Sequence, residues 1–432
     1  MGVIKRGVKL HILFIDSNRY GLDALRKAKA LGHQVSFISS EQWQLYSAQD
    51  KASLSCVDYW KELPDTNHPQ QVLQVAQDIH QQSPIHAVIC TLEPAMRSAA
   101  YVAQALQLPF TSVEAVNICR DKDKTRERLA QHHIPSAQYH YAETKEELLA
   151  CIQKIGLPVI LKPRSGAASL MTYRLNTLAD FDGVWHEIET TRKQLPEAIQ
   201  QEIGFGVLVE EYLKGKIISV EIARREQNYF VFMVSARHRS VEKETEEVGI
   251  SMPAAIDEDT WDSAVSYAKQ VIEAIGLDFG LFHIEIMLTD KGPRLVEANP
   301  RMMGGSMPRL YQNLTGQDLY ETLIALYSGQ AFSVPNPHDF GFIATRRFQL
   351  AQSCVLAKPF DTQLVEKYRP CIKSLQWDLP QQYPQTLPAG YILGRVQLQM
   401  KDNAALESLI EQLFRDIETA YPSLQLRRSM DK

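Results

Sequence analysis

The sequence predicts a protein of mixed α/β and α+β class, built from about three folded units. Its 432 residues correspond to roughly three domains of ordinary size. In the first part of the chain, apolar strand-like runs alternate with helix-like segments, an order typical of a parallel sheet. Farther along, neighbouring strand-like runs are joined by short turns, which favours antiparallel pairing.

The first part of the chain, residues 1–117, is expected to form a Rossmann-like domain. The predicted elements are a strand at 10–15, a helix at 20–31, a strand at 34–39, a helix at 69–82, a strand at 87–91 and a helix at 95–106. Gly32 marks the end of the first helix. The turn after the first strand lacks the glycine spacing that lets a backbone approach a pyrophosphate. Dinucleotide binding is therefore disfavoured.

The rest of the chain is predicted to form two further domains, over 118–335 and 336–432. Strands are expected at 159–162, 207–212, 217–224, 229–235, 281–288 and 294–298. After residue 335 we expect strands at 342–350 and 391–400 and a helix at 404–420. The chain shows no internal repeat and no low-complexity stretch.

Composition excludes several classes of function. Hydrophobic residues make up 45% of the chain and charged residues 22%, the balance of an ordinary globular protein. The formal net charge of −5, with both signs mixed along the chain, gives no electrostatic footprint for nucleic acid. No run reaches the roughly 18 apolar residues that span a bilayer, and no signal peptide is evident. The six cysteines include no C-x-x-C pair, so neither a zinc site nor a disulfide framework is expected. We expect small-molecule substrates and a cytoplasmic location, and the sequence leaves a homodimer open.

The segment 281–301 is the most informative of the chain, because it predicts a β-hairpin with two opposed acids. The turn Asp290-Lys291-Gly292 is a three-residue loop whose last glycine supplies the left-handed conformation that such hairpins need. This register places Thr289 opposite Pro293 and therefore Glu285 opposite Glu297.

Strand alternation makes one face of this hairpin polar and the other apolar. The polar face is predicted to carry His283, Glu285, Leu295, Glu297 and Asn299, and the apolar face Phe282, Ile284, Ile286, Leu288, Val296 and Ala298. Carboxylates opposed across a ladder, with Cβ atoms roughly 5 Å apart, repel each other unless a cation lies between them. Oxygen ligands favour Mg²⁺, with Mn²⁺ as an alternative, shared with nucleotide phosphates. A merely solvated acidic face is the competing interpretation.

The residues after the hairpin strengthen the metal interpretation. Asn299 adds an amide oxygen, Arg301 a guanidinium, and Gly304 and Gly305 a flexible loop. An arginine at this place can hold a phosphate or a carboxylate through two parallel hydrogen bonds, which a lysine cannot do.

These residues resemble the ATP-grasp superfamily, in which the paired acids and the following asparagine bind magnesium. The resemblance covers most of the chain. It implies an ATP-grasp fold with a Rossmann-like N-terminal domain, a central two-lobed domain that binds ATP and magnesium, and a C-terminal lid. The segment from Gly390 to Gly394 and the helix after it resemble that lid.

The resemblance also implies a set of nucleotide-binding residues. Lys122 matches a family lysine that reaches the phosphates, and Lys162 ends an apolar strand from which its ammonium group can reach the α- and β-phosphates. The small polar loop 164–169, which includes Ser165 and Gly166, is expected to fold over the phosphates. Ile217 stands where the family often has a ribose-binding acid. The expected adenine segment consists of Glu210, Glu211, Tyr212 and Leu213.

Within the superfamily, the chain is similar to L-amino-acid ligases and carnosine-synthase-like enzymes. This similarity implies an ADP-forming carboxylate–amine ligase that works through an acylphosphate, with Lys162 and Arg301 as catalytic groups. The residues expected at the substrates are His283, Glu247, Arg301, Gly304, Gly305 and Arg309. For His283 and Glu247 a structural role is an equal alternative. Two other functions stay open: a bicarbonate-activating enzyme of the biotin-carboxylase kind, and a non-catalytic ATP-binding scaffold.

Overall fold

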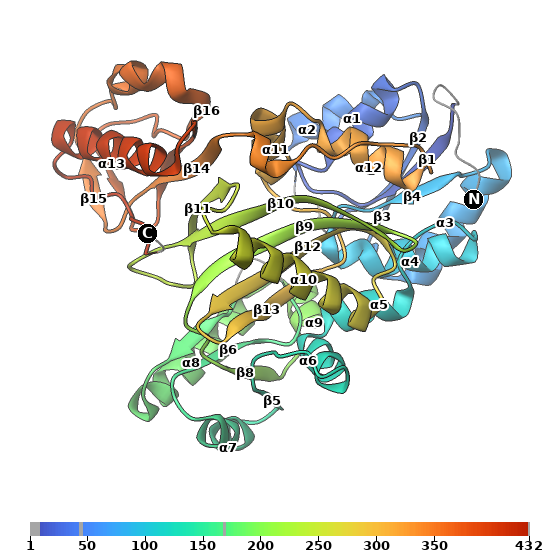
Figure 1. The fold of residues 1–432 in the computed structure, drawn as a ribbon, viewed down its shortest axis with the longest axis horizontal. Helices are drawn as coiled ribbons and strands as arrows, with labels where there is room; N and C mark the ends of the chain where they lie inside the picture. Colours follow the sequence, from blue (N-terminus) through green and yellow to red (C-terminus); the bar gives the residue numbers. More distant parts are fainter. Residues whose placement is uncertain (1–8, 43–45, 167–169, 431–432) are drawn as a thin grey trace.

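The computed structural model describes residues 9–42, 46–166 and 170–430, and their strands form three main sheets and one small two-stranded sheet. In Figure 1 the four-stranded antiparallel sheet lies below the long eight-stranded sheet, with the N-terminal sheet at the upper right. The C-terminal part of the chain forms the upper left of the molecule. None of the described helices combines the length and the apolar character that crossing a bilayer needs.

The N-terminal sheet confirms the expected parallel arrangement. Its strands lie in the order β3-β2-β1-β4, and every pair is parallel. The strands are β1 (His11–Ile15), β2 (Gln34–Ser40), β3 (Tyr59–Leu63) and β4 (Ala87–Ile89), and the main helices are α1 (Leu22–Ala30), α3 (Pro69–Gln82) and α4 (Met96–Ala105). The sequence did not reveal β3, because its polar and partly exposed residues lack an apolar run.

The second sheet has the order β5-β8-β6-β7, and all its pairs are antiparallel. Its strands are β5 (Tyr139–Ala142), β6 (Val159–Pro163), β7 (Tyr173–Leu175) and β8 (Val207–Glu211). The helices of this region are α5 (Val113–Arg120), α6 (Lys122–Gln131), α7 (Lys145–Ile155), α8 (Phe181–Gln194) and α9 (Glu197–Ile203). We call this sheet with its helices α7, α8 and α9 the small lobe.

The eight-stranded sheet is antiparallel throughout and has the order β13-β12-β9-β10-β11-β14-β18-β16. Its strands are β9 (Lys216–Arg225), β10 (Asn228–Arg239), β11 (Glu247–Met252), β12 (Phe279–Thr289), β13 (Gly292–Asn299), β14 (Phe342–Gln349), β16 (Ile372–Trp377) and β18 (Ile392–Met400). Helices α10 (Glu258–Ile275), α11 (Met307–Thr315), α12 (Leu319–Tyr327) and α13 (Asn403–Ala420) pack around it, and β15 (Cys354–Leu356) pairs with β17 (Gln385–Leu387). Since β11 pairs with β14, the sheet continues across the expected boundary at 335/336. The domain boundaries themselves stay predictions.

The apolar core links the N-terminal sheet to the eight-stranded sheet. Phe14 of β1 and Phe37 of β2 belong to the same buried cluster as Ile222 of β9 and Phe282 of β12. The small lobe has a separate cluster that includes Val209 of β8. The apolar core of the small lobe is therefore separate from that of the rest of the molecule, and residues of the small lobe and of the eight-stranded sheet together line a pocket described below.

The β12–β13 hairpin confirms the predicted pairing of Glu285 with Glu297, but the prediction for its tip is wrong. Thr289 pairs with Gly292 rather than with Pro293, so the connection is one residue shorter than expected. A β-bulge next to Glu285, in which Val296 is the extra residue, restores the register.

The bulge also changes the faces of two side chains. Leu295, expected on the polar face, is fully buried opposite Ile286 in the apolar core, although it also borders the pocket that Val296 lines. Val296, expected on the apolar face, is only half-buried and lines a pocket. A bulge reverses the inside–outside alternation locally, which strand periodicity alone does not reveal.

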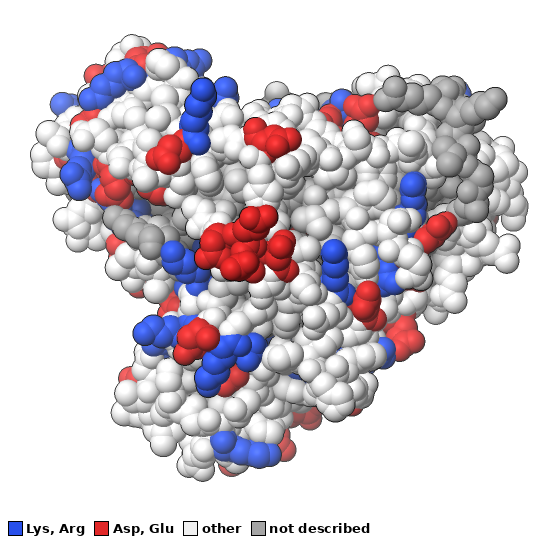
Figure 2. Space-filling model, in the orientation of Figure 1, with Lys and Arg blue, Asp and Glu red and all other residues white. Residues whose placement is uncertain are grey.

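Charged side chains on the face shown in Figure 2 are mixed, with one larger acidic group over the N-terminal end of α10. Asp257 caps this helix and Glu258 and Asp259 lie in its first turn, all three exposed. Acids at this end of a helix are stabilised by the helix dipole. Lysines and arginines are scattered on this face rather than gathered into one basic patch.

Candidate active site

Glu285 and Glu297 lie where two pockets meet. The first, which we call the interlobe pocket, has a volume of about 220 Å³ and lies between the small lobe and the eight-stranded sheet. The second, the arginine-lined pocket, has a volume of about 710 Å³ and is bordered by Arg120, Arg237, Arg301, Arg347 and Arg395. Among the described residues, six line both pockets: Gly166, Leu170, Arg237, Glu247, Glu285 and Glu297. The acid pair therefore faces both spaces.

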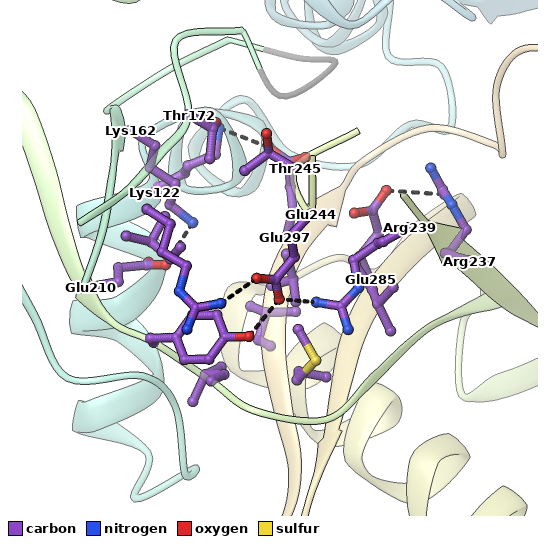
Figure 3. A pocket seen from close by; sticks show the side chains of 18 of the residues that line it. Lys122, Lys162, Thr172, Glu210, Arg237, Arg239, Glu244, Thr245, Glu285 and Glu297 are labelled. Carbon is purple, nitrogen blue, oxygen red and sulfur yellow. Dashed lines mark hydrogen bonds and ion pairs between the residues drawn. The ribbon is translucent and has the colours of Figure 1, made fainter. Parts of the chain in front are cut away.

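Lys122 reaches across the interlobe pocket to the acid pair (Figure 3). It starts helix α6, and its Nζ lies 2.8 Å from Glu297 Oε1 and donates to the Gly166 carbonyl at 2.9 Å. Burial lowers the pKa of Lys122, but the charge of Glu297 outweighs this and the net pKa is raised. Lys122 is thus a fixed positive charge at the junction of the pockets.

Lys162 is held by the acid that the sequence assigned to adenine binding. At the end of β6, its Nζ lies 2.7 Å from Glu210 Oε2, while Arg126 Nε lies 2.9 Å from Glu210 Oε1. Burial raises the pKa of Glu210, yet Arg126 and Lys162 together bring it down to about 2. The pKa of Lys162 is lowered, chiefly by burial. Glu210 lines the pocket as an ionised anchor that fixes the lysine.

The loop after Lys162 is only partly described. Ser165 and Gly166 line the interlobe pocket, and Gly166 has a φ of +118°, which favours glycine. Ser165 Oγ donates to Asp121 at 3.4 Å. Residues 167–169, which the prediction of a phosphate-covering loop includes, lie outside the described residues.

Glu211, Tyr212, Leu213 and Ile217 line the other end of the interlobe pocket, together with a charged cluster that the sequence did not predict. Glu244 accepts a hydrogen bond from Tyr212 Oη at 2.5 Å and pairs with Arg174 at 2.7 Å and with Arg239 at 2.9 Å. The Arg174 guanidinium also stacks 3.9 Å from the centre of the Tyr212 ring. Because Arg174 belongs to β7 and Arg239 to β10, this cluster joins the small lobe to the eight-stranded sheet.

Arg237, another residue that the sequence analysis missed, neutralises Glu285 and Glu247. Its Nη1 lies 3.1 Å from Glu285 Oε1, and its Nε donates to Glu247 in a short ion pair. Burial would raise the pKa of Glu285, but Arg237 and His283 lower it, so Glu285 is ionised. The available signal was two arginines, at 237 and 239, at the end of an otherwise apolar strand.

His283 lies at the wall of the arginine-lined pocket and contacts two acids. It is 3% exposed; its Nδ1 lies 2.9 Å from both oxygens of the fully buried Glu221, and its Nε2 lies 3.0 Å from Glu285 Oε1. Burial lowers the pKa of His283, but Glu221 and Glu285 raise it to about 9. The imidazolium thus donates one proton to each acid. In the sequence, Glu221 could have been found as a lone acid in an apolar strand. The fold places it opposite His283 in the sheet.

In the arginine-lined pocket, Arg301 is fixed by Glu93 at 2.8 Å and by the Asn299 side-chain oxygen at 3.1 Å. Gly304 and Gly305 line the same pocket, as do His283 and Glu247. Arg309 does not, and its side chain is exposed. In α11 its neighbours Pro308 and Leu310 take the buried positions, and Arg309 lines an adjoining pocket of about 360 Å³ together with Gly305, so its expected role at the substrates stays a prediction.

Comparisons with known proteins identify the family. Residues 25–110 match the ATP-grasp N-terminal domain and residues 155–308 match the ATP-grasp domain. Alanine–anticapsin ligase of Bacillus amyloliquefaciens is 24% identical over 301 residues, which are 62% of this chain and only 62% of that enzyme's length. Human carnosine synthase 1 is 25% identical over 248 residues, 55% of this chain and 30% of that protein.

A solved structure shows the same fold over almost the whole chain. The L-amino acid ligase from Bacillus licheniformis superposes with a TM-score of 0.73 at 20% sequence identity, covering 96% of this chain and 98% of that one. This protein is therefore a member of the ATP-grasp superfamily, as the hairpin acids and the lysines indicated from the sequence.

Proposed function

We propose that the protein is an ADP-forming carboxylate–amine ligase that joins amino-acid-like substrates through an acylphosphate. ATP-grasp proteins use ATP, and the single observation that carries the proposal is the position of the acid pair. Glu285 and Glu297 face an interlobe pocket on one side and a larger, separately lined pocket on the other. A phosphoryl group entering from the first pocket and a carboxylate entering from the second would meet beside these acids.

The interlobe pocket suits ATP. Adenine would lie at the end lined by Glu211, Tyr212, Leu213 and Ile217, and the phosphates would extend toward Lys122, Lys162, Ser165 and Gly166. The apolar side chain of Ile217 offers no ribose contact, but Glu244 lines the same pocket and carries carboxylate oxygens. Lys162 is buried and the Lys122 side chain is only 13% exposed, so their attraction for phosphate is weakly screened by solvent.

The acid pair also suits a divalent cation. Among the described residues no group of three or more His, Cys, Asp or Glu side chains has the arrangement of a metal site. A hard ion here would therefore draw on Glu285, Glu297 and the amide oxygen of Asn299, and complete its ligands with phosphate oxygens, as Mg²⁺ prefers. When bound, Mg²⁺ or Mn²⁺ would neutralise charge on the phosphates. In this structure Lys122 forms an ion pair with Glu297 and Arg237 forms one with Glu285, so both cations lie beside the expected metal position.

The chemistry divides between the two pockets. A substrate carboxylate oxygen attacks the γ-phosphorus of ATP, the bond from that phosphorus to the β–γ bridging oxygen breaks, and ADP leaves. The amine of the second substrate then attacks the acyl carbon, loses a proton and releases phosphate. Lys122, Lys162 and Arg301 position the phosphates and neutralise their charge, which is the main protein contribution to phosphoryl transfer. Glu247, held by Arg237, would receive a substrate ammonium group.

The test is an assay of nucleotide products over a panel of amino-acid pairs, with Glu297→Ala as the inactive control. We expect ADP and phosphate to form only when a carboxylate and an amine substrate are both present. AMP and pyrophosphate would refute the acylphosphate mechanism. Bicarbonate-dependent ADP release that ignores amino acids would favour a biotin-carboxylase-like reaction, and ATP binding without turnover would favour a scaffold. The cytoplasmic location and the homodimer stay predictions.

A further inference from the structure

A second pair of like charges is opposed in the eight-stranded sheet, far from the acid hairpin in the strand order. Arg347 of β14 lies directly opposite Arg395 of β18, and both side chains line the arginine-lined pocket. Like charges opposed across a ladder destabilise the pair unless an opposite charge lies between them. The argument that suggested a cation between two glutamates therefore suggests an anion beside two arginines.

The acids that border this pocket are already paired with other cations. Each has a short ion pair: Glu93 with Arg301, Glu202 with Arg120, Glu247 with Arg237, Glu285 with Arg237, and Glu297 with Lys122. These acids therefore supply little negative charge to Arg347 and Arg395.

The compensation of the two arginines is incomplete. The ion pair described for Arg347 is a distant one, 3.8 Å from Glu247 Oε1, whose other oxygen accepts from Arg237. Arg395 pairs with Asp378 at 2.9 Å, but the Asp378 side chain is 55% exposed, so water screens this pair. Two guanidinium groups thus border one pocket with spare donors, a geometry suited to binding a carboxylate.

The position of the arginines decides which carboxylate they can bind. Strand β11, which carries Glu247, lies between β10, which carries Arg237, and β14, which carries Arg347. Arg347 is therefore separated from Arg237 and Glu285 by Glu247. The reacting carboxylate must lie near Glu285 and Glu297, so the anion at Arg347 is a different group. Thr345 lies two residues before Arg347 in β14, on the same face of the sheet, and adds a hydroxyl group to this wall of the pocket.

We infer that Arg347 and Arg395 form a specificity subsite for a second, non-reacting carboxylate on one of the two substrates. This inference rests on the proposed ligase function and narrows it to amino-acid substrates. The group is either the free α-carboxylate of the amine substrate or an acidic side chain of the acyl donor. Both sources present the same chemistry, and substrate analogues distinguish them.

The experiment compares Arg347→Gln and Arg395→Gln with wild type, with Arg369→Gln as the matched control. Arg369 is exposed and lines neither pocket. For each variant, KM and kcat are measured with amine substrates that are amino acids or their carboxamides, and with acyl donors that carry an acid or an amide side chain. A hydrogen-bonded ion pair is lost in each variant, so KM should rise about tenfold or more for the substrate with the second carboxylate. The KM for ATP should change less than about twofold, because neither arginine lines the interlobe pocket.

The analogue whose KM stays unchanged identifies the source. If carboxamide acceptors are insensitive to the substitutions, the anion is the acceptor's α-carboxylate; if amide-bearing donors are insensitive, it is the donor's side chain. Equal KM values for wild type and Arg347→Gln with all four kinds of substrate would overturn the inference while leaving the ligase function intact. Arg347→Lys keeps the charge and should recover part of the affinity, which separates charge recognition from a folding defect. If wild type forms no ADP with amino acids, calorimetric titration of L-glutamate into wild type and Arg347→Gln still tests the subsite, since equal affinities would overturn it.

Discussion

The two like-charge pairs of the eight-stranded sheet differ in how the protein compensates them. At the β12–β13 edge, Glu285 forms ion pairs with Arg237 and with the His283 imidazolium, and Glu297 forms one with Lys122, all within 3.1 Å. At the β14–β18 pair, Arg395 forms an ion pair with the exposed Asp378, and the acid nearest to Arg347 is Glu247 at 3.8 Å. The acids are thus neutralised by side chains that are 4% to 19% exposed, whereas Arg347 and Arg395 are 34% and 39% exposed.

This difference separates catalysis from recognition. Phosphoryl transfer needs groups fixed before substrate arrives, because their positions stabilise the transition state. The acids of the β12–β13 pair meet this need through the ion pairs of Glu285 with Arg237 and His283 and of Glu297 with Lys122. A specificity subsite gains more from groups whose donors are not held by protein acids before the ligand binds, and Arg347 is partly exposed with its nearest described acid 3.8 Å away. The following predictions test each side of the comparison.

Removing the charge of either acid of the β12–β13 pair should have the largest effect on activity. Glu285→Gln and Glu297→Gln keep the side-chain shape but remove a charge that the phosphate-bound cation requires. We expect ADP formation to fall by about 10²- to 10³-fold, the usual range for losing one transition-state electrostatic contact. The rate of ADP release at saturating ATP is the measurement.

The control for this prediction comes from the same hairpin. Asp290 lies at its exposed tip, outside both pockets, so Asp290→Asn removes a charge of the same sign from the same element. That variant should keep wild-type activity. More than a tenth of wild-type activity in Glu297→Gln would show that the acid pair is not the catalytic edge of the sheet.

The sequence predicted the acid pair because the relevant information is local. A glycine-containing turn and a two-residue side-chain period are enough to place Glu285 opposite Glu297. The same reasoning failed at Leu295 and Val296, because a bulge shifts the register without any residue that announces it. The strands of the N-terminal sheet and their parallel pairing were likewise largely predictable from apolar periodicity and the alternation with helices, except for the polar strand β3.

The partners of the acids were not predictable, because non-local strand pairing delivers them. Arg237 stands 48 positions before Glu285 in the sequence and reaches it through the order of β10, β9 and β12. Glu221 reaches His283 in the same way, across the β9–β12 pairing. Arg347 and Arg395 belong to a part of the chain that the sequence treated as a separate lid, although their strands extend the same sheet. Side-chain periodicity specifies a face, and only the fold specifies the neighbours on that face.

Replacing His283, the cation between Glu221 and Glu285, should have the next largest effect, and this effect is on the stability of the protein. Because Glu221 and Glu285 raise the pKa of His283 to about 9, the folded state favours the imidazolium more than the unfolded state does. This stabilisation is complete below the unfolded pKa near 6.5 and is lost as the pH rises through 9. The free energy of unfolding should therefore fall by on the order of 3 kcal/mol between pH 6.5 and 9.

The measurement is urea unfolding of wild type and His283→Gln at several pH values across this range. Wild type should lose stability as the pH rises, and His283→Gln should lose much less. His132→Gln serves as the control, since His132 is exposed and lies on neither pocket. Parallel pH profiles for wild type and His283→Gln would mean that the acid edge does not depend on this imidazolium for its compensation.

The smallest effect is expected at Arg309, and it sharpens the comparison from the arginine side. The sequence placed Arg309 with the substrate residues; its side chain is exposed on α11 and lines an adjoining pocket that shares Gly305 and Arg395 with the arginine-lined pocket, but not the arginine-lined pocket itself. Arg309→Gln should therefore change KM for either substrate by less than about twofold, the range of an ordinary surface substitution. Arg347→Gln, which removes the same charge from the pocket wall, should change KM by about tenfold or more. An equally large change from Arg309→Gln in the same steady-state assay would mean that positive charge anywhere near this mouth attracts the substrate, and that the opposed position of Arg347 and Arg395 confers no special recognition.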